Sequence, residues 1–75
     1  MFNENMKTIA DVRKWLVHRG TVIYTRDRMI DLDMMDQEFT EFYQQGMIDK
    51  LLYLQAKRII SGEKQIEQQK RGTKE

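Results

Sequence analysis

Two arginines and one tyrosine lie close together in a part of the chain that has no helical pattern. Tyr24, Arg26 and Arg28 occupy alternate positions between two predicted helices. A tyrosine ring can stack on an unpaired base and guanidinium groups can hold phosphate, a combination used by proteins that bind single-stranded nucleic acid. We therefore predict a site for single-stranded RNA or DNA at these residues, with Arg19 and Arg58 contributing further positive charge.

The same residues also have a structural interpretation, and the sequence leaves both open. In that interpretation the ring of Tyr24 is an edge of the core, and the loop arginines pair with Asp27, Asp31 or other acids of the following helix. Single surface ion pairs of this kind contribute little and are common. A wider basic surface requires the first and third helices to lie side by side. Its members would be Arg13, Lys14, Arg19, Lys57 and Arg58.

The chain offers few residues for catalysis or for holding a metal. His18 is its one histidine and cysteine is absent, and Ser61 is the one serine. A calcium-binding loop beginning at Asp31 would need glycine at its sixth position and glutamate at its twelfth. Those positions hold Asp36 and Phe42. We therefore predict no catalytic residue, no metal site and no cofactor.

Charge is distributed unevenly along the chain, although the net charge is only +1. Residues 26–46 carry two arginines and six acids, whereas residues 50–75 carry seven basic residues and three glutamates. The simplest interpretation is that the helices neutralise one another. The acidic middle favours a protein-interaction role, while the basic flanks favour nucleic-acid binding.

The small size of the chain indicates a partner. A domain of 75 residues buries only about 60% of the surface that its unfolded chain exposes, so its core is marginal. Disulfides are excluded because there is no cysteine. We therefore predict a homo-oligomer or, as an alternative function, an adaptor that contacts another protein. The apolar residues available for such an interface are Trp15, Met34, Leu51 and Leu54.

The sequence also favours a cytoplasmic protein without a membrane partner. The longest apolar run covers residues 51–54, far short of the roughly 20 residues that span a bilayer. The first residues lack the basic and then apolar pattern of a signal peptide.

Capping residues, glycines and apolar spacing together predict three helices. The predicted helices are residues 9–19, 32–45 and 50–61. Their N-caps are Thr8, Asp31 and Asp49, whose side chains can accept hydrogen bonds from the first amides of a helix. Gly20 and Gly46 follow the first two helices, where a left-handed residue is expected.

The apolar side chains of these helices predict one shared core. The predicted buried residues are Leu16, Val22, Ile23, Leu32, Met35, Phe39, Phe42, Leu52, Ala56 and Ile59. Val22 and Ile23 come from residues 21–25, a β-branched segment too short to form a sheet by itself. We expect this segment to be an extended linker that fills the core, or to pair with the same segment of a second copy.

The predicted fold is therefore all-α: a three-helix bundle with an extended segment between the first and second helices. Residues 1–75 form a single domain in this prediction, ordered over about residues 8–61. Residues 62–75 contain one apolar side chain, Ile66. This polar tail is expected to be a frayed helix or disordered.

The order of these residues resembles the YqgQ-like family over roughly residues 8–60. The residues that carry the resemblance are Asp11-Val12, Gly20-Thr21, Ile23-Tyr24-Thr25, Asp27-Arg28, Leu32, Met35, Glu38, Tyr43, Ile48-Asp49-Lys50, Tyr53-Leu54, Ala56 and Ile59. The resemblance implies a three-helix bundle in a cytosolic protein of Gram-positive bacteria, without an established activity and with single-stranded nucleic acid as a proposed ligand.

The chain departs from the family pattern at Arg26, where family members usually have glycine. If this position requires a positive φ angle, an arginine there costs on the order of 1 kcal/mol. The arginine also adds a positive charge to the loop.

Overall fold

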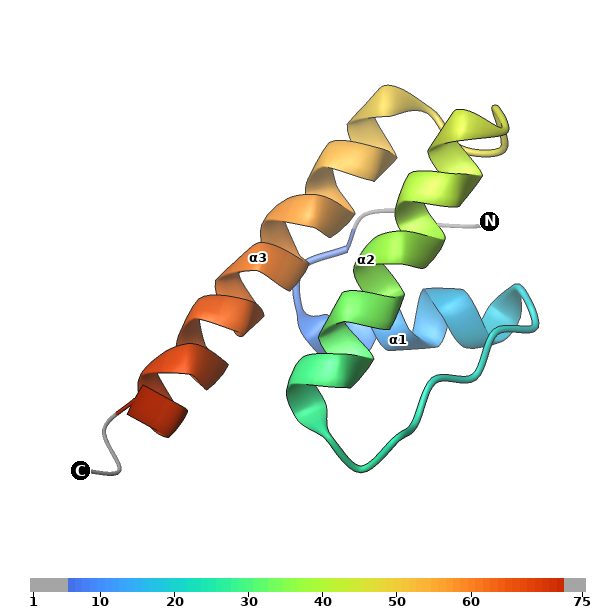
Figure 1. Ribbon diagram of the computed structural model, residues 1–75. Coiled ribbons are helices and arrows are strands. Elements are labelled where there is room, and N and C mark those ends of the chain that lie inside the picture. The colour runs from blue at the N-terminus through green and yellow to red at the C-terminus, as the bar shows by residue number, and fades with distance from the viewer. Residues whose placement is uncertain (1–5, 73–75) are drawn as a thin grey trace.

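The computed structural model describes residues 6–72, and within them it confirms the all-α class. The helices are α1 (Ile9–His18), α2 (Arg28–Gln44) and α3 (Lys50–Gly72). α2 and α3 are antiparallel neighbours, and α1 runs across them (Figure 1). A linker of residues 19–27 connects α1 to α2. Residues 1–5 and 73–75 of the predicted single domain lie outside the described residues.

The ends of α1 follow the local sequence as predicted. The Thr8 side chain accepts a hydrogen bond from the Asp11 amide, and the Asp11 carboxylate accepts one from the Thr8 amide, which is a capping box. After the helix, Gly20 has a φ angle of +87°. The amide of Thr21 then donates to the carbonyl of Leu16 at 2.9 Å, as in a Schellman motif.

Gly46 closes α2 in the same way, but α2 begins earlier than predicted. The N-cap is Asp27, whose carboxylate accepts hydrogen bonds from the amides of Met29 and Ile30 at 2.9 and 3.2 Å. The prediction of Asp31 as the N-cap is wrong: this residue lies inside the first turn and is 4% exposed. Both aspartates can cap a helix, but in the structure Asp31 accepts hydrogen bonds from Thr25 instead.

Three aromatic rings pack together where α1 crosses α2. The Trp15 ring lies 5.0 Å from Phe39 and 5.6 Å from Phe42 between ring centroids. Such tilted and edge-to-face pairs add roughly 0.5–1.5 kcal/mol each beyond the area they bury. Trp15 is therefore a core residue, and the prediction that it is spare for an interface is wrong.

Seven of the ten predicted core residues are buried, and five further residues join them. Val22 is 77% exposed, so its predicted burial is wrong, whereas its neighbour Ile23 is buried. Phe42 and Ile59 are only partly buried against the core, and Ile60 is fully buried. The buried set is Met6, Val12, Trp15, Leu16, Ile23, Leu32, Met35, Phe39, Ile48, Leu52, Ala56 and Ile60.

α3 continues to Gly72, well beyond the end predicted at residue 61. The prediction stopped where apolar residues become scarce and where Ser61 and Gly62 adjoin. Gly62 lies inside the helix, a cost of about 1 kcal/mol relative to alanine. The added turns are rich in Lys, Glu and Gln, which favour helix, and several of them form ion pairs with α2.

Candidate nucleic-acid interface

The linker presents Tyr24 to solvent because its side chains alternate in direction. Val22 and Tyr24 are 77% and 72% exposed, while Ile23 between them is 5% exposed. Successive side chains of non-helical, extended backbone point to opposite sides. Filling the core with Ile23 therefore turns both neighbours outward, which explains why Val22 is not buried.

Two polar contacts from the helices hold this linker in place. The Arg13 side chain on α1 donates from Nη1 to the carbonyl of Ile23 at 2.6 Å. On α2, Asp31 accepts two hydrogen bonds at its Oδ1 atom, from the amide of Thr25 at 2.8 Å and from its hydroxyl at 2.7 Å. Hydrogen bonds to a charged group are typically worth about 1.5–3 kcal/mol. Asp31 therefore anchors the linker rather than capping a helix.

The backbone turns sharply at Arg26, which has a φ angle of 71°. This φ angle lies in the left-handed region, so the position where the family usually has glycine does require a positive φ. A non-glycine residue is uncommon there, and the strain is of the order of 1 kcal/mol. The exposed Arg26 side chain thus occupies a position that glycine would fill at lower conformational cost.

One surface hollow collects the predicted loop residues. It is lined by Arg13, Tyr24, Arg26, Arg28 and Asp31, and we call it the arginine–tyrosine hollow. Its three guanidinium groups come from α1, from the linker and from the first residue of α2. The carboxylate among them accepts hydrogen bonds from Thr25. The hollow therefore combines an exposed phenol ring with an excess of positive charge.

Arg28 is partly engaged by α3. Its Nη2 atom lies 2.8 Å from the Glu63 carboxylate, and its Nε atom lies 3.8 Å from Glu67. The sequence interpretation placed its partners on the second helix, so the acids that pair with it are on a different element. They were missed because the third helix was expected to end before them.

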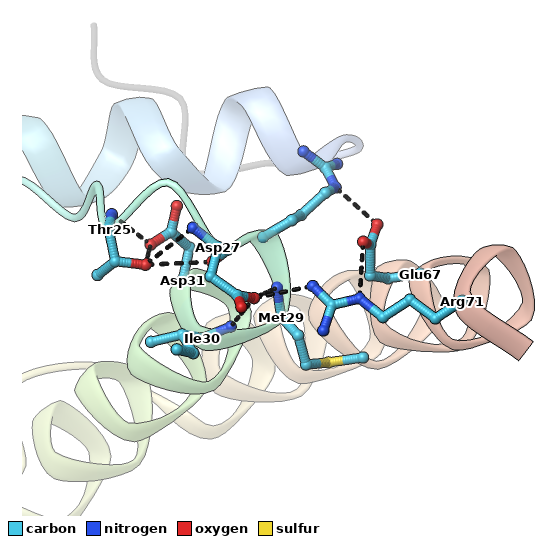
Figure 2. A network of polar contacts seen from close by, with 8 residues as sticks. Thr25, Asp27, Met29, Ile30, Asp31, Glu67 and Arg71 are labelled. Carbon is cyan, nitrogen blue, oxygen red and sulfur yellow. Dashed lines mark hydrogen bonds and ion pairs between the residues drawn. The ribbon is translucent and has the colours of Figure 1, made fainter.

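The same end of α3 also reaches the N-cap of α2 (Figure 2). Arg71 pairs with Asp27 at 2.8 Å and with Glu67 at 3.2 Å. The hydrogen bond from Arg71 and, to a smaller extent, the one from the amide of Ile30 hold the pKa of Asp27 below its usual range. The N-cap of α2, the border of the hollow and the last turns of α3 therefore form one network of charges.

Arg19 and Arg58, the two more distant predicted residues, are not among the residues that line the hollow. The Arg19 guanidinium lies over the Trp15 ring, 4.4 Å from its centroid, a cation–π contact. Arg58 is on α3 and lines a different hollow with Leu51 and Leu54. The structure therefore supports Arg13 as the additional cation of the site, a residue that the sequence analysis had placed only in a wider basic surface.

Other basic residues of α3 are occupied by the acids of α2. Lys57 pairs with Asp36, and Lys64 lies 2.9 Å from Asp36 and 3.0 Å from Asp33. Partial burial alone would raise the pKa of Asp36, but hydrogen bonds from the two lysines outweigh it and lower the pKa. Between α2 and α3, the prediction that the helices neutralise one another is confirmed. We call this row of ion pairs the α2–α3 seam.

The predicted interface residues other than Trp15 are exposed. Met34, Leu51 and Leu54 have exposed fractions of 41%, 69% and 50%. Met34 lies on α2 and the two leucines lie on α3. The two leucines line a common hollow.

Over residues 6–72, no group of three or more histidine, cysteine, aspartate or glutamate side chains is arranged to hold a metal ion. Among the same residues, no helix has the length and apolar character needed to cross a membrane.

The fold and the site define a small three-helix protein that carries a basic, aromatic hollow between α1 and α2. The chain belongs to the YqgQ-like family, whose family model matches residues 6–66. It is 33% identical over 67 residues to Uncharacterized protein YqgQ of Bacillus subtilis (strain 168), a match that covers 89% of this chain and 92% of the relative. No solved structure matches the chain significantly.

Proposed function

We propose that this protein is a small non-catalytic module that binds single-stranded nucleic acid in the arginine–tyrosine hollow. The observation that supports the proposal is the convergence of three guanidinium groups, from α1, the linker and α2, around the exposed ring of Tyr24. The three elements are held in register by the core and by the hydrogen bonds of Arg13 and Asp31. The site therefore does not need to be assembled by its ligand.

The chemistry of the hollow suits a single strand better than a duplex. An exposed tyrosine can stack only on a base whose face is free, and bases in a duplex are stacked on one another. The flanking guanidinium groups provide planar donors that match phosphate oxygens. Tyr24 would hold one base, while Arg13 and Arg26 hold the adjoining phosphates.

The affinity of such a site is limited by its size. Stacking of one base contributes about 1–3 kcal/mol. Each phosphate contact on a single strand adds about 0.7 to the slope of log K against log salt concentration. Two or three contacts therefore support micromolar binding at best, with a slope of about −1.4 to −2.1.

The non-catalytic part of the proposal is supported by the chemistry of the hollow. Its ionisable side chains are three arginines, one tyrosine and one aspartate that accepts two hydrogen bonds from Thr25. Arginine stays protonated in proteins and does not transfer protons near neutral pH. His18 is exposed at the end of α1 and does not line the hollow.

A titration with a fluorescent single-stranded 12-mer tests the proposal. The wild type, Tyr24→Ala and Arg26→Gly are compared by fluorescence anisotropy at about 50 and 200 mM salt. We expect each variant to bind roughly five- to tenfold more weakly than the wild type at the lower salt concentration. Arg26→Gly is informative because it removes a guanidinium while relieving the positive φ angle, so its loss of binding would not come from loss of stability.

Arg58→Ala is the matched control, since it removes an exposed arginine outside the hollow. It should leave the affinity for the 12-mer within about twofold of the wild type, because an arginine that does not contact the nucleic acid contributes little to binding. A duplex of the same sequence should bind more weakly than the single strand. The proposal fails if the wild type shows no saturable, salt-dependent binding below about 100 µM.

A further inference from the structure

A second hollow lies on α3 and is built mainly from apolar residues. It is lined by Met6, Lys7, Leu51, Leu54, Gln55, Arg58 and Ile59, and we call it the leucine groove. Met6 is buried and Ile59 partly buried, so they belong to the core, while Leu51 and Leu54 are 69% and 50% exposed. The groove has a volume of about 560 Å³, enough for a few side chains of another chain.

The exposed leucines follow the surface of one helix. Leu51, Leu54 and Arg58 are spaced at i, i+3 and i+7 on α3. This spacing places two apolar side chains and one cation in a row along one face. A face of this kind matches a partner helix that carries its own apolar row, since helices recognise grooves through anchors at i, i+3 or i+4, and i+7.

The charges around the groove are basic. Lys7 and Arg58 are the charged lining residues, and no described lining residue is acidic. Leu54 and Arg58 also line the adjoining hollow, where Asp36 is neutralised by Lys57 and Lys64. A partner that lies along α3 over these leucines therefore meets an excess of positive charge, which favours acidic side chains beside its apolar row.

The charge pattern disfavours a second copy of this chain and a nucleic acid in the groove. Two-fold pairing of the groove with itself would bring Lys7 and Arg58 towards the same cations of the other copy. Pairing with the exposed Met34 side of α2 would join unlike surfaces, which does not close a dimer. No aromatic ring lines the groove to stack a base.

We propose that the leucine groove binds an acidic amphipathic helix of a partner protein. The apolar row of that helix would cover Leu51 and Leu54, and its carboxylates would pair with Lys7 and Arg58. The groove shares no lining residue with the arginine–tyrosine hollow, so the two activities are independent and one can fail without the other.

Two designed helical peptides of about 18 residues test this proposal. Both carry leucines at i, i+3 and i+7; glutamates flank the leucines in the first peptide, and lysines replace these glutamates in the second. Binding to the full chain is followed by fluorescence anisotropy at about 50 mM salt. We expect the acidic peptide to bind at least tenfold more tightly than the basic one.

Variants locate the binding. Leu51→Ser/Leu54→Ser should weaken binding of the acidic peptide at least tenfold, while the control Ile66→Ser, an exposed apolar residue of α3 outside the groove, should not. Arg58→Glu should reduce the preference for the acidic peptide. Because all of these side chains are largely exposed, circular dichroism should show folded proteins.

Three outcomes would overturn the proposal. The first is equal binding of both peptides, or no binding of the acidic peptide below about 1 mM. The second is a dimer of the chain alone in sedimentation that Leu51→Ser/Leu54→Ser abolishes, which would assign the groove to a second copy. The third is a loss of affinity for the single-stranded 12-mer in the leucine variant, which would assign the groove to nucleic acid.

Discussion

The α2–α3 seam and the arginine–tyrosine hollow are both rich in charge, but they use it in opposite ways. In the seam, Lys57 and Lys64 lie in contact with Asp33 and Asp36. In the hollow, Arg26 has no ion pair among the described residues, and Arg13 donates to a backbone carbonyl. A count of charges therefore does not identify a binding surface. What matters is whether carboxylates lie within reach of the cations.

The difference follows from the kind of backbone that carries the charged residues of the seam and of the hollow. The seam joins two antiparallel helices, so acids along α2 meet bases along α3 at regular intervals. The hollow forms where a linker leaves α1 and enters α2, and this irregular backbone turns Tyr24 outward while its neighbour Ile23 is buried. Arg28 differs from the other two arginines, because it lines the hollow and also pairs with Glu63 of α3.

The largest effect should come from the apolar core, not from the ion pairs of the seam. Phe39→Ala removes a fully buried ring that packs on Trp15, and such changes cost about 3–5 kcal/mol. Lys64→Gln removes a partly exposed cation of the seam and should cost less than about 1 kcal/mol. Urea denaturation followed by circular dichroism measures both. Equal costs would mean that the ion pairs stabilise the fold as strongly as the core does.

The next largest effect concerns Asp31, which holds the linker of the hollow in place but is not one of its cations. Asp31→Ala leaves the Thr25 amide without its acceptor and leaves the Thr25 hydroxyl only the more distant carbonyl of Asp27, at 3.2 Å, which should cost about 1–3 kcal/mol. Asp31→Asn retains an acceptor oxygen and should restore part of that stability. Binding of the 12-mer should weaken in the alanine variant because the linker loses its anchor. If stability and binding are unchanged in Asp31→Ala, the linker is held by other contacts.

The sequence predicted those parts of the fold that depend on neighbouring residues. Thr8 and Gly20 delimit α1 through local hydrogen bonds, and these were identified correctly. Asp27 and Asp31 are both suitable N-caps by residue type, and the sequence did not show that Asp31 would be buried and bonded to Thr25. Trp15 was misassigned because its burial depends on the direction in which α1 crosses α2, which no local pattern specifies.

The candidate site divides in the same manner. Tyr24, Arg26 and Arg28 are close in sequence, so their proximity in space could be predicted. Arg13 joins them only through the packing of α1 against the linker, and Glu63 reaches Arg28 across a separation of 35 residues. The continuation of α3 past Gly62 could not be recognised from apolar spacing, because those turns are held by charge.

A smaller effect concerns Arg28, the arginine of the hollow that pairs with acids of α3. Glu63→Gln removes the carboxylate that lies 2.8 Å from its guanidinium, so a phosphate would no longer compete with it. We expect about two- to fivefold tighter binding of the single-stranded 12-mer, since rim charges have modest effects. The control Glu38→Gln removes an acid of α2 that does not line the hollow. Weaker binding in Glu63→Gln would show that the ion pair positions Arg28 for its ligand.

The smallest predicted effect is a dependence of stability on pH that belongs to the seam. Asp36 has a folded-state pKa below its usual value of 3.8; partial burial opposes this shift, and the hydrogen bonds from Lys57 and Lys64 outweigh the burial. A carboxyl group of this kind binds a proton more readily in the unfolded chain, so the stability it contributes is complete above about pH 5 and is lost as pH falls through the folded-state pKa.

Because Asp36 remains partly exposed, that contribution should stay below about 1 kcal/mol. The difference in unfolding free energy between wild type and Asp36→Asn should therefore be small at pH 6 and shrink further as the pH falls below about 4, as measured by urea denaturation at low salt. Glu38→Gln gives the effect of removing one acidic charge from the same helix. A difference in unfolding free energy that grows on acidification would contradict the lowered pKa of Asp36. It would require a folded-state pKa above the unfolded one. The hydrogen bonds from the lysines of the seam would then not outweigh the effect of burial on Asp36.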